Sequence, residues 1–206
     1  MWKILAKKAL YLHNFAYKLS SFLAIKAEGG EHPKHRLMDY HKFFLDNIQP
    51  KDKVLDIGCG QGELAFDLAK KASKVVGIDF NEKYLAKAKE KYKSENIEYI
   101  LGNAAEYDFK ENFDIAILSN VLEHIEKRQE FLQKIKPLAR KFLIRVPILD
   151  RDWLTLYKKE IGVEHRLDRG HFIEYTLEGF KSELSGAGFY IEQYFIQFGE
   201  IYAIIL

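Results

Sequence analysis

Hydrophobic positions divide the chain into one long amphipathic segment and a series of short apolar runs. In residues 1–27, apolar side chains recur every three or four positions, which predicts one helix or two short helices. Gly29 and Gly30 follow and end this segment. Residues 31–49 have Pro33 near their start and predict a further helix.

From residue 53 onward, apolar runs alternate with helical patterns. The runs predict five strands, at Lys53–Ile57, Lys74–Asp79, Ile97–Leu101, Phe113–Leu118 and Lys141–Val146. The periodicity between them predicts helices at Gly62–Lys71, Glu82–Lys93 and Glu126–Leu138. Strands separated by helices form a parallel sheet with helices on both faces, so we predict an α/β fold that is doubly wound and Rossmann-like.

The end of the chain predicts an exception to the parallel order. After an irregular stretch, Thr176–Ala187 has a helical pattern that Gly188 ends. The apolar runs Tyr190–Gln197 and Ile201–Leu206 are separated by only three residues, whereas a parallel crossover needs about a dozen. We therefore predict a seven-stranded sheet that is parallel except for an antiparallel C-terminal hairpin strand.

The chain is expected to have two parts. Residues 1–49 are predicted to be a helical extension or lid, and residues 50–206 to be the domain that carries the chemistry.

Composition and charge fit a soluble globular protein. The chain has 206 residues, of which 48% are hydrophobic and 30% charged, and its net charge of +2 gives no overall bias toward nucleic acid. The single cysteine, Cys59, excludes an intrachain disulfide and fits a reducing cytoplasm. Every apolar stretch is too short to cross a bilayer without charge. We expect a cytoplasmic protein, as a monomer or a homodimer.

The charge of residues 1–27 changes this picture locally, because the segment holds five lysines and no acidic residue. One interpretation is a helix docked on the body of the protein or on a second copy. A second is an interfacial helix, with lysines at anionic headgroups and an aromatic face below them. A cleaved targeting peptide is a third, although the segment lacks arginines and a small-residue cleavage pattern.

The turn after the first predicted strand carries the strongest functional signal. Residues 53–63 read KVLDIGCGQGE, and a dinucleotide loop of the form G-x-G-x-x-G would require glycine where Glu63 stands. Asp56 precedes the first glycine by two positions, and Asp79 ends the next apolar run. This D-x-G-x-G-x-G pattern resembles the first motif of the class I S-adenosylmethionine-dependent methyltransferases, and favours methyl transfer over hydride transfer.

The resemblance extends over roughly residues 50–205 and implies S-adenosylmethionine as the cofactor. The cofactor site is expected where strand order reverses, at the carboxyl ends of the strands. Asp56 would accept from the ammonium of the cofactor and Asp79 from its ribose hydroxyls; alternatively, Asp56 caps the following helix. The predicted cofactor-binding residues are Asp56, Gly58, Cys59, Gly60, Gly62, Asp79, Phe80, Asn103, Ala104, Ser119 and Asn120.

Asn103 stands where the family usually has an acid that accepts from the adenine amino group. An amide oxygen can accept the same bond without charge, but Asn103 can equally cap a short turn.

The end of the fourth predicted strand reads SNVLEHI and resembles the ubiquinone-biosynthesis-type small-molecule methyltransferases. His124 is the candidate general base for a hydroxyl or amine acceptor, because a neutral imidazole can take its proton. The alternative is that Glu123 and His124 only close the wall of the site.

Two polar clusters flank this region and are expected to bind the acceptor. Their mixed charge suits a hydroxylated or anionic small molecule. The candidate substrate residues are His35, Arg36, Tyr40, His165 and His171. Their histidines lack a known ligand spacing, so the sequence predicts no metal.

Missing motifs narrow the function further. The stretch after Ser119 lacks the [DNS]-P-P-[YF] motif of amino-methylating DNA enzymes, and Cys59 cannot serve as a cytosine-C5 nucleophile. We predict methyl transfer to oxygen or nitrogen of a small molecule, with lipid-linked and sugar acceptors included and nucleic acid disfavoured. A non-catalytic cofactor-binding protein and, less favoured, a nicotinamide-dependent oxidoreductase remain the alternatives.

Overall fold

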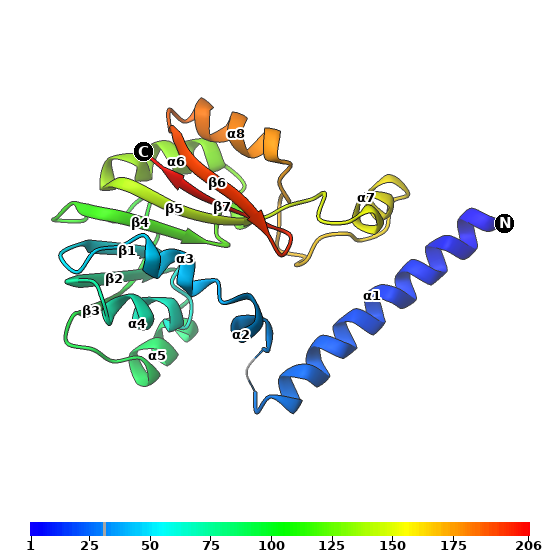
Figure 1. Cartoon of the computed structure of the whole chain (residues 1–206), viewed down its shortest axis with the longest axis horizontal. Helices are drawn as coiled ribbons and strands as arrows, with labels where there is room; N and C mark the ends of the chain where they lie inside the picture. The colour runs from blue at the N-terminus through cyan, green and yellow to red at the C-terminus, as the bar shows by residue number, and fades with distance from the viewer. Residues whose placement is uncertain (31) are drawn as a thin grey trace.

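The computed structural model describes residues 1–30 and 32–206 and has one mixed sheet at its centre (Figure 1). The strands are β1 (Lys53–Ile57), β2 (Lys74–Asp79), β3 (Ile97–Leu101), β4 (Phe113–Ser119), β5 (Ala139–Pro147), β6 (Ile191–Gln197) and β7 (Glu200–Ile205). Their order is β3-β2-β1-β4-β5-β7-β6. β1 to β5 pair in parallel, whereas β7 runs antiparallel to both β5 and β6. The predicted fold class is confirmed.

Helices cover both faces of the sheet and bury two apolar clusters. On one face, Phe44 and Leu68 pack with residues of β1 and β2 beneath α3 (His41–Asp46) and α4 (Glu63–Ala69). On the other face, a larger cluster lies beneath α6 (Arg128–Ile135) and α8 (Leu177–Gly186). A sheet buried on both faces explains why its strands read as continuous apolar runs.

Helix ends differ from the predictions where a residue imposes its own geometry. The helix predicted at Gly62–Lys71 begins at Glu63 as α4, because Gly62 adopts the left-handed conformation at φ +86°. α5 spans Glu82–Lys91. The helix predicted at Glu126–Leu138 is divided into α6 and a short 3₁₀ turn, η2 (Lys136–Leu138), which has a proline in its first turn.

The helix predicted over residues 31–49 is wrong as a single element; its first residue, Glu31, lies outside the described residues. The structure has α2 (Lys34–Met38) and then α3. Asp39 takes the left-handed conformation at φ 43°, and this breaks the helix between the two.

The stretch read as irregular after the fifth strand contains a helix, α7 (Trp153–Glu160). Asp152 begins it, because Oδ1 of Asp152 accepts the backbone N–H of Thr155 at 2.7 Å. Asp152 and Thr155 already have the spacing of such a cap in the sequence. The helix is short and half-exposed, however, so its apolar periodicity is too weak to predict it.

Residues 1–27 form one helix, α1 (Trp2–Ala27), which projects beyond the sheet toward α7 (Figure 1). The side chain of Asn14 donates to the carbonyl of Glu164 at 2.8 Å, and His13 Nδ1 lies 3.2 Å from Lys158 Nζ. Within the helix, only Leu10 is buried. The large apolar side chains that it exposes are Trp2, Ile4, Leu5, Tyr11, Leu12, Phe15, Tyr17, Leu19, Phe22 and Leu23. Over the described residues, neither α1 nor any other helix has the length and apolar character needed to traverse a bilayer.

Candidate functional site

The glycine turn between β1 and α4 requires glycine for two separate reasons. Gly58, Gly60 and Gly62 have φ values of +70°, +55° and +86°, which L side chains rarely adopt. A Cβ at position 58 would lie 2.7 Å from Val121 Cγ2, and one at position 62 would lie 2.6 Å from the Tyr99 hydroxyl. At Gly60 no atom lies within 4 Å of such a Cβ, so the space beside the backbone is open there.

Asp56 lies below this turn with an unsatisfied carboxyl oxygen. The residue is 2% exposed, and its Oδ2 makes no hydrogen bond within the described part of the chain. Burial, followed by the charge of Asp79, raises the pKa of Asp56 to about 8. The N-cap residue of α4 is Gly62, without a side-chain capping bond, so Asp56 does not cap that helix. A buried acceptor with no partner fits a cationic donor such as an ammonium group.

Asp79, at the carboxyl end of β2, is tied to the same turn. Its Oδ2 accepts the backbone N–H of Gly60 at 2.9 Å, and its Oδ1 accepts that of Asn81 at 2.7 Å. Each carboxylate oxygen keeps a second lone pair, so both can still accept from a pair of hydroxyls. The geometry therefore fits the adjacent hydroxyls of a ribose.

Other predicted cofactor residues surround these acids. Cys59 is buried against Gly77, and burial raises the pKa of its thiol, which makes it a packing residue. Phe80 follows Asp79 and is 79% exposed, so its ring is available to cover a ligand. Asn103 Oδ1 accepts the backbone N–H of Ala105 at 3.0 Å, as the capping alternative expects, and Ala104 is buried beside it.

The end of β4 connects the cofactor region to a polar network. Ser119 is half-buried, and Asn120 takes φ 56°. Asn120 Oδ1 accepts from Arg145 Nε at 2.6 Å, while its Nδ2 donates to Glu123 Oε1 at 2.8 Å. Asn120 therefore links β5 to the turn that carries Glu123 and His124.

Arg145 is the centre of this network and was not among the site residues predicted from the sequence. It is buried on β5, with Nε 2.9 Å from Glu200 Oε2 on β7 and its guanidinium carbon 3.7 Å from the ring centroid of Tyr40. Burial raises the pKa of Tyr40 to about 12, so its hydroxyl stays protonated. A charged residue within the apolar run FLIRVPIL was the available signal, because a buried cation needs partners.

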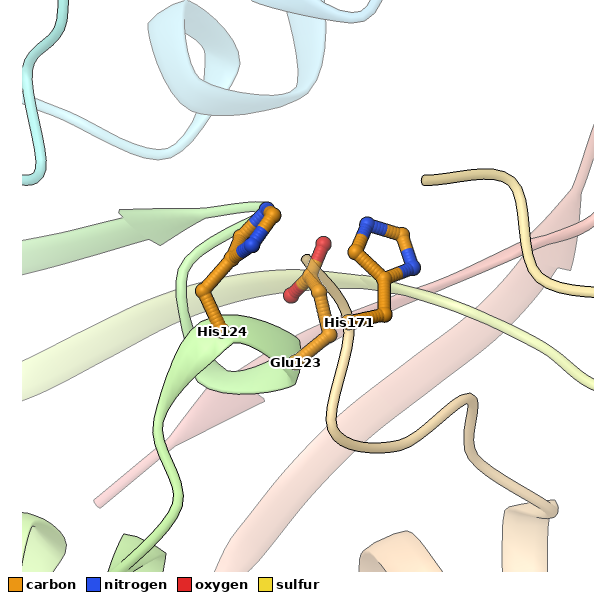
Figure 2. Close-up of side chains that lie close together, drawn as sticks. All are labelled: Glu123, His124 and His171. Carbon is orange, nitrogen blue, oxygen red and sulfur yellow. The ribbon is translucent and has the colours of Figure 1, made fainter. Parts of the chain in front are cut away.

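Two predicted histidines from distant segments meet beside this network (Figure 2). His124 ends a 3₁₀ turn, η1 (Leu122–His124), and its ring centroid lies 4.7 Å from that of His171. Glu123, fully buried between them, has its pKa raised to about 7 by burial. Burial, followed by the charge of His171, lowers the pKa of His124, which keeps this imidazole neutral. From the sequence, Glu123 was expected at most to close the wall of the site.

The remaining predicted substrate residues are His35, Arg36 and His165, and each has a different set of contacts. His35 Nδ1 is 2.6 Å from the hydroxyl of Tyr40, which connects α2 to Arg145. Arg36 pairs with Glu28 at 3.1 Å on the surface. The backbone carbonyl of His165 accepts from Arg151 at 2.6 Å, and its side chain is half-buried.

Comparison with known proteins finds relatives of part of the chain. Residues 54–141 match a family model described as a methyltransferase domain. Ubiquinone biosynthesis O-methyltransferase of Bradyrhizobium diazoefficiens is 31% identical over 118 residues, which are 56% of this chain and 47% of that protein. Demethylmenaquinone methyltransferase of Lactococcus lactis is 34% identical over 117 residues, which are 52% of this chain and 45% of that protein. The chain thus spans about half the length of these curated relatives.

Solved structures agree with the observed sheet. Magnesium protoporphyrin IX methyltransferase from Synechocystis, with bound S-adenosylhomocysteine, superposes with a TM-score of 0.67 at 20% identity, over 83% of this chain and 82% of that chain. The predicted resemblance is therefore confirmed over the matched region: residues 54–141 match a methyltransferase domain, and the sheet has the fold of the solved methyltransferase. The cofactor of such methyltransferases is S-adenosylmethionine, as predicted.

Proposed function

We propose that this chain transfers a methyl group from S-adenosylmethionine to an oxygen or nitrogen of a small-molecule acceptor. The unpartnered, buried oxygen of Asp56 beside the glycine turn carries this proposal. When bound, the cofactor supplies a methyl group on a sulfonium, and the sulfur keeps the bonding electron pair when the methyl group leaves. Asp56 holds the amino-acid end of the cofactor and Asp79 its ribose, so the chain mainly aligns donor and acceptor.

The acceptor is proposed to lie over the polar network at the ends of β4 and β5. His124 is neutral and exposed, so it can take the proton that a hydroxyl or amine loses as it attacks. Arg145 Nη1 is buried without a hydrogen-bond partner among the described residues, and it can donate to an acceptor oxygen. The names of the matched relatives refer to ubiquinone and menaquinone, which favours an aromatic hydroxyl compound with an apolar tail.

We further propose that α1 holds the protein at a membrane surface, with residues 1–49 as a lid over the acceptor. Its body contacts run through His13 and Asn14, and its exposed apolar side chains lie mainly on the opposite side of the helix. The helix has five lysines and no acid, which complements anionic headgroups.

Calorimetry of the full chain tests the methyltransferase proposal. We expect S-adenosylmethionine to bind in the micromolar range and S-adenosylhomocysteine to be released with hydroxylated quinone precursors. Absence of cofactor binding would contradict the proposal. Tight cofactor binding without turnover of any acceptor would favour the alternative, a non-catalytic protein of the same fold.

Vesicle flotation tests the membrane proposal separately. We expect the full chain to float with vesicles containing phosphatidylglycerol and not with neutral phosphatidylcholine vesicles. Phe15→Asp should abolish flotation, whereas Tyr17→Asp, at an equally exposed position on another side of the helix, should retain it. Equal behaviour of the two variants would exclude α1 as an oriented membrane helix.

A further inference from the structure

We propose that Glu123, His124 and His171 form a binding site for a divalent first-row transition metal ion. One possible ligand atom from each of these residues lies within 4.8 Å of the other two. Two imidazoles and one carboxylate are donors that suit zinc, manganese or iron better than magnesium or calcium, which prefer oxygen ligands. The spacing of residues in the sequence did not predict this site, because His171 comes from a loop far along the chain (Figure 2).

The strongest support comes from the carboxylate. Glu123 is fully buried, and its Oε1 is occupied by the amide of Asn120 at 2.8 Å. Its Oε2 has no hydrogen-bond partner in the described part of the chain, and the carboxylate lies between the two rings (Figure 2). Leaving a buried carboxylate oxygen unsatisfied is costly, and a cation at this point would remove that cost.

His171 has a partner on its second ring nitrogen, as metal-binding histidines have. His171 Nδ1 lies 3.4 Å from Oε1 of the buried Glu174, which is itself paired with Arg151. This arrangement leaves Nε2 of His171 as the donor for an ion. The His124 ring lies against Gly170, because its Nδ1 would be 3.4 Å from a Cβ at that position.

The catalytic role of such an ion rests on the proposed function. Three protein ligands leave open coordination positions, where an acceptor hydroxyl could bind next to the methyl donor. With the ion bound, His124 is a ligand and not the base, so the ion would lower the pKa of that hydroxyl and the proton would pass to solvent. A carbon–oxygen bond then forms as the carbon–sulfur bond breaks, and the sulfur retains the electron pair.

Metal binding is measured on the full chain without any methyl donor. After chelator treatment and dialysis, calorimetry with manganese or zinc should show one ion per chain in the micromolar range or tighter. Glu123→Gln should weaken binding at least 100-fold, whereas His165→Gln, in the same loop region as His171, should bind as the wild type does. No binding by the wild type, or equal binding by Glu123→Gln, would overturn the site.

A second measurement makes the result independent of folding of the variants. Cobalt added to the wild-type chain should give visible absorption bands typical of nitrogen and oxygen ligands, and His124→Asn should change them. Absence of these bands would count against the site. Calorimetry with S-adenosylmethionine separates the two proposals, because loss of cofactor binding with metal binding intact refutes only the proposed function, and the reverse result refutes only the metal site.

Discussion

The cofactor half of the sheet and its acceptor half are built in different ways. Around β1 and β2, the candidate cofactor groups Asp56, Asp79 and the glycine turn come from one short stretch of chain and are held largely by backbone hydrogen bonds. Around β4, β5 and β7, the candidate groups come from distant segments and depend on side-chain pairs such as Arg145 with Glu200. The first half is a local structure, whereas the second exists only after the whole sheet has assembled.

Removing the central cation of the acceptor half should have the largest effect on stability. Arg145→Met leaves Glu200 buried beside β5 without its charged partner, and we expect a loss of about 3–5 kcal/mol in the free energy of unfolding. Urea denaturation measures this directly. The double variant Arg145→Met with Glu200→Gln should recover part of the loss. A single variant as stable as the wild type would show that the ion pair does not hold the two strands.

The comparison also explains which features the sequence could reveal. β1 and β2 have the predicted bounds because each is a largely buried run of apolar residues, and the half-buried edge strand β3 also has its predicted bounds. The contact between His124 and His171 was not visible, since nothing in the local pattern fixes how the loop after α7 returns to β4. The break at Asp39 was equally hidden, because an aspartate only occasionally adopts the left-handed conformation and no glycine marks the position.

In the cofactor half, removing one acid should have a moderate effect on binding. Asp79→Ala deletes the acceptor at the end of β2 and the bond to Gly60, so S-adenosylmethionine should bind about 1–3 kcal/mol more weakly. Calorimetry measures the difference, and circular dichroism checks that the variant is folded. Unchanged affinity would remove Asp79 from the cofactor site.

The pH dependence of stability should report on Asp56. The folded chain holds its proton up to a pKa of about 8, whereas an unfolded aspartate loses it near pH 4. The folded state thus binds more protons between these values, and the stability of the cofactor-free chain should fall as the pH rises. The slope contributed by Asp56 is at most about 1.4 kcal/mol per pH unit.

Urea denaturation at pH 6 and at pH 8 measures this slope. Glu123, whose pKa burial raises to about 7, adds to it with the same sign. Asp56→Asn removes the contribution of Asp56 alone, so its slope should be shallower than that of the wild type. Identical slopes would mean that Asp56 does not keep its proton in the folded chain over this pH range.

The smallest effect is expected outside both halves, on α1. Phe15 is 63% exposed, so Phe15→Ser should change the free energy of unfolding by less than about 0.5 kcal/mol. The same urea experiment measures it. A larger loss would mean that Phe15 packs against the body or against a second copy, and that α1 is not available to a membrane.

A crystal structure of the chain with S-adenosylhomocysteine tests the central claim most directly. The account predicts the ligand over residues 58–62, with its ammonium within hydrogen-bond distance of Asp56 Oδ2 and its ribose hydroxyls on Asp79. A ligand bound elsewhere, or an Asp56 that keeps no contact with it, would contradict the account.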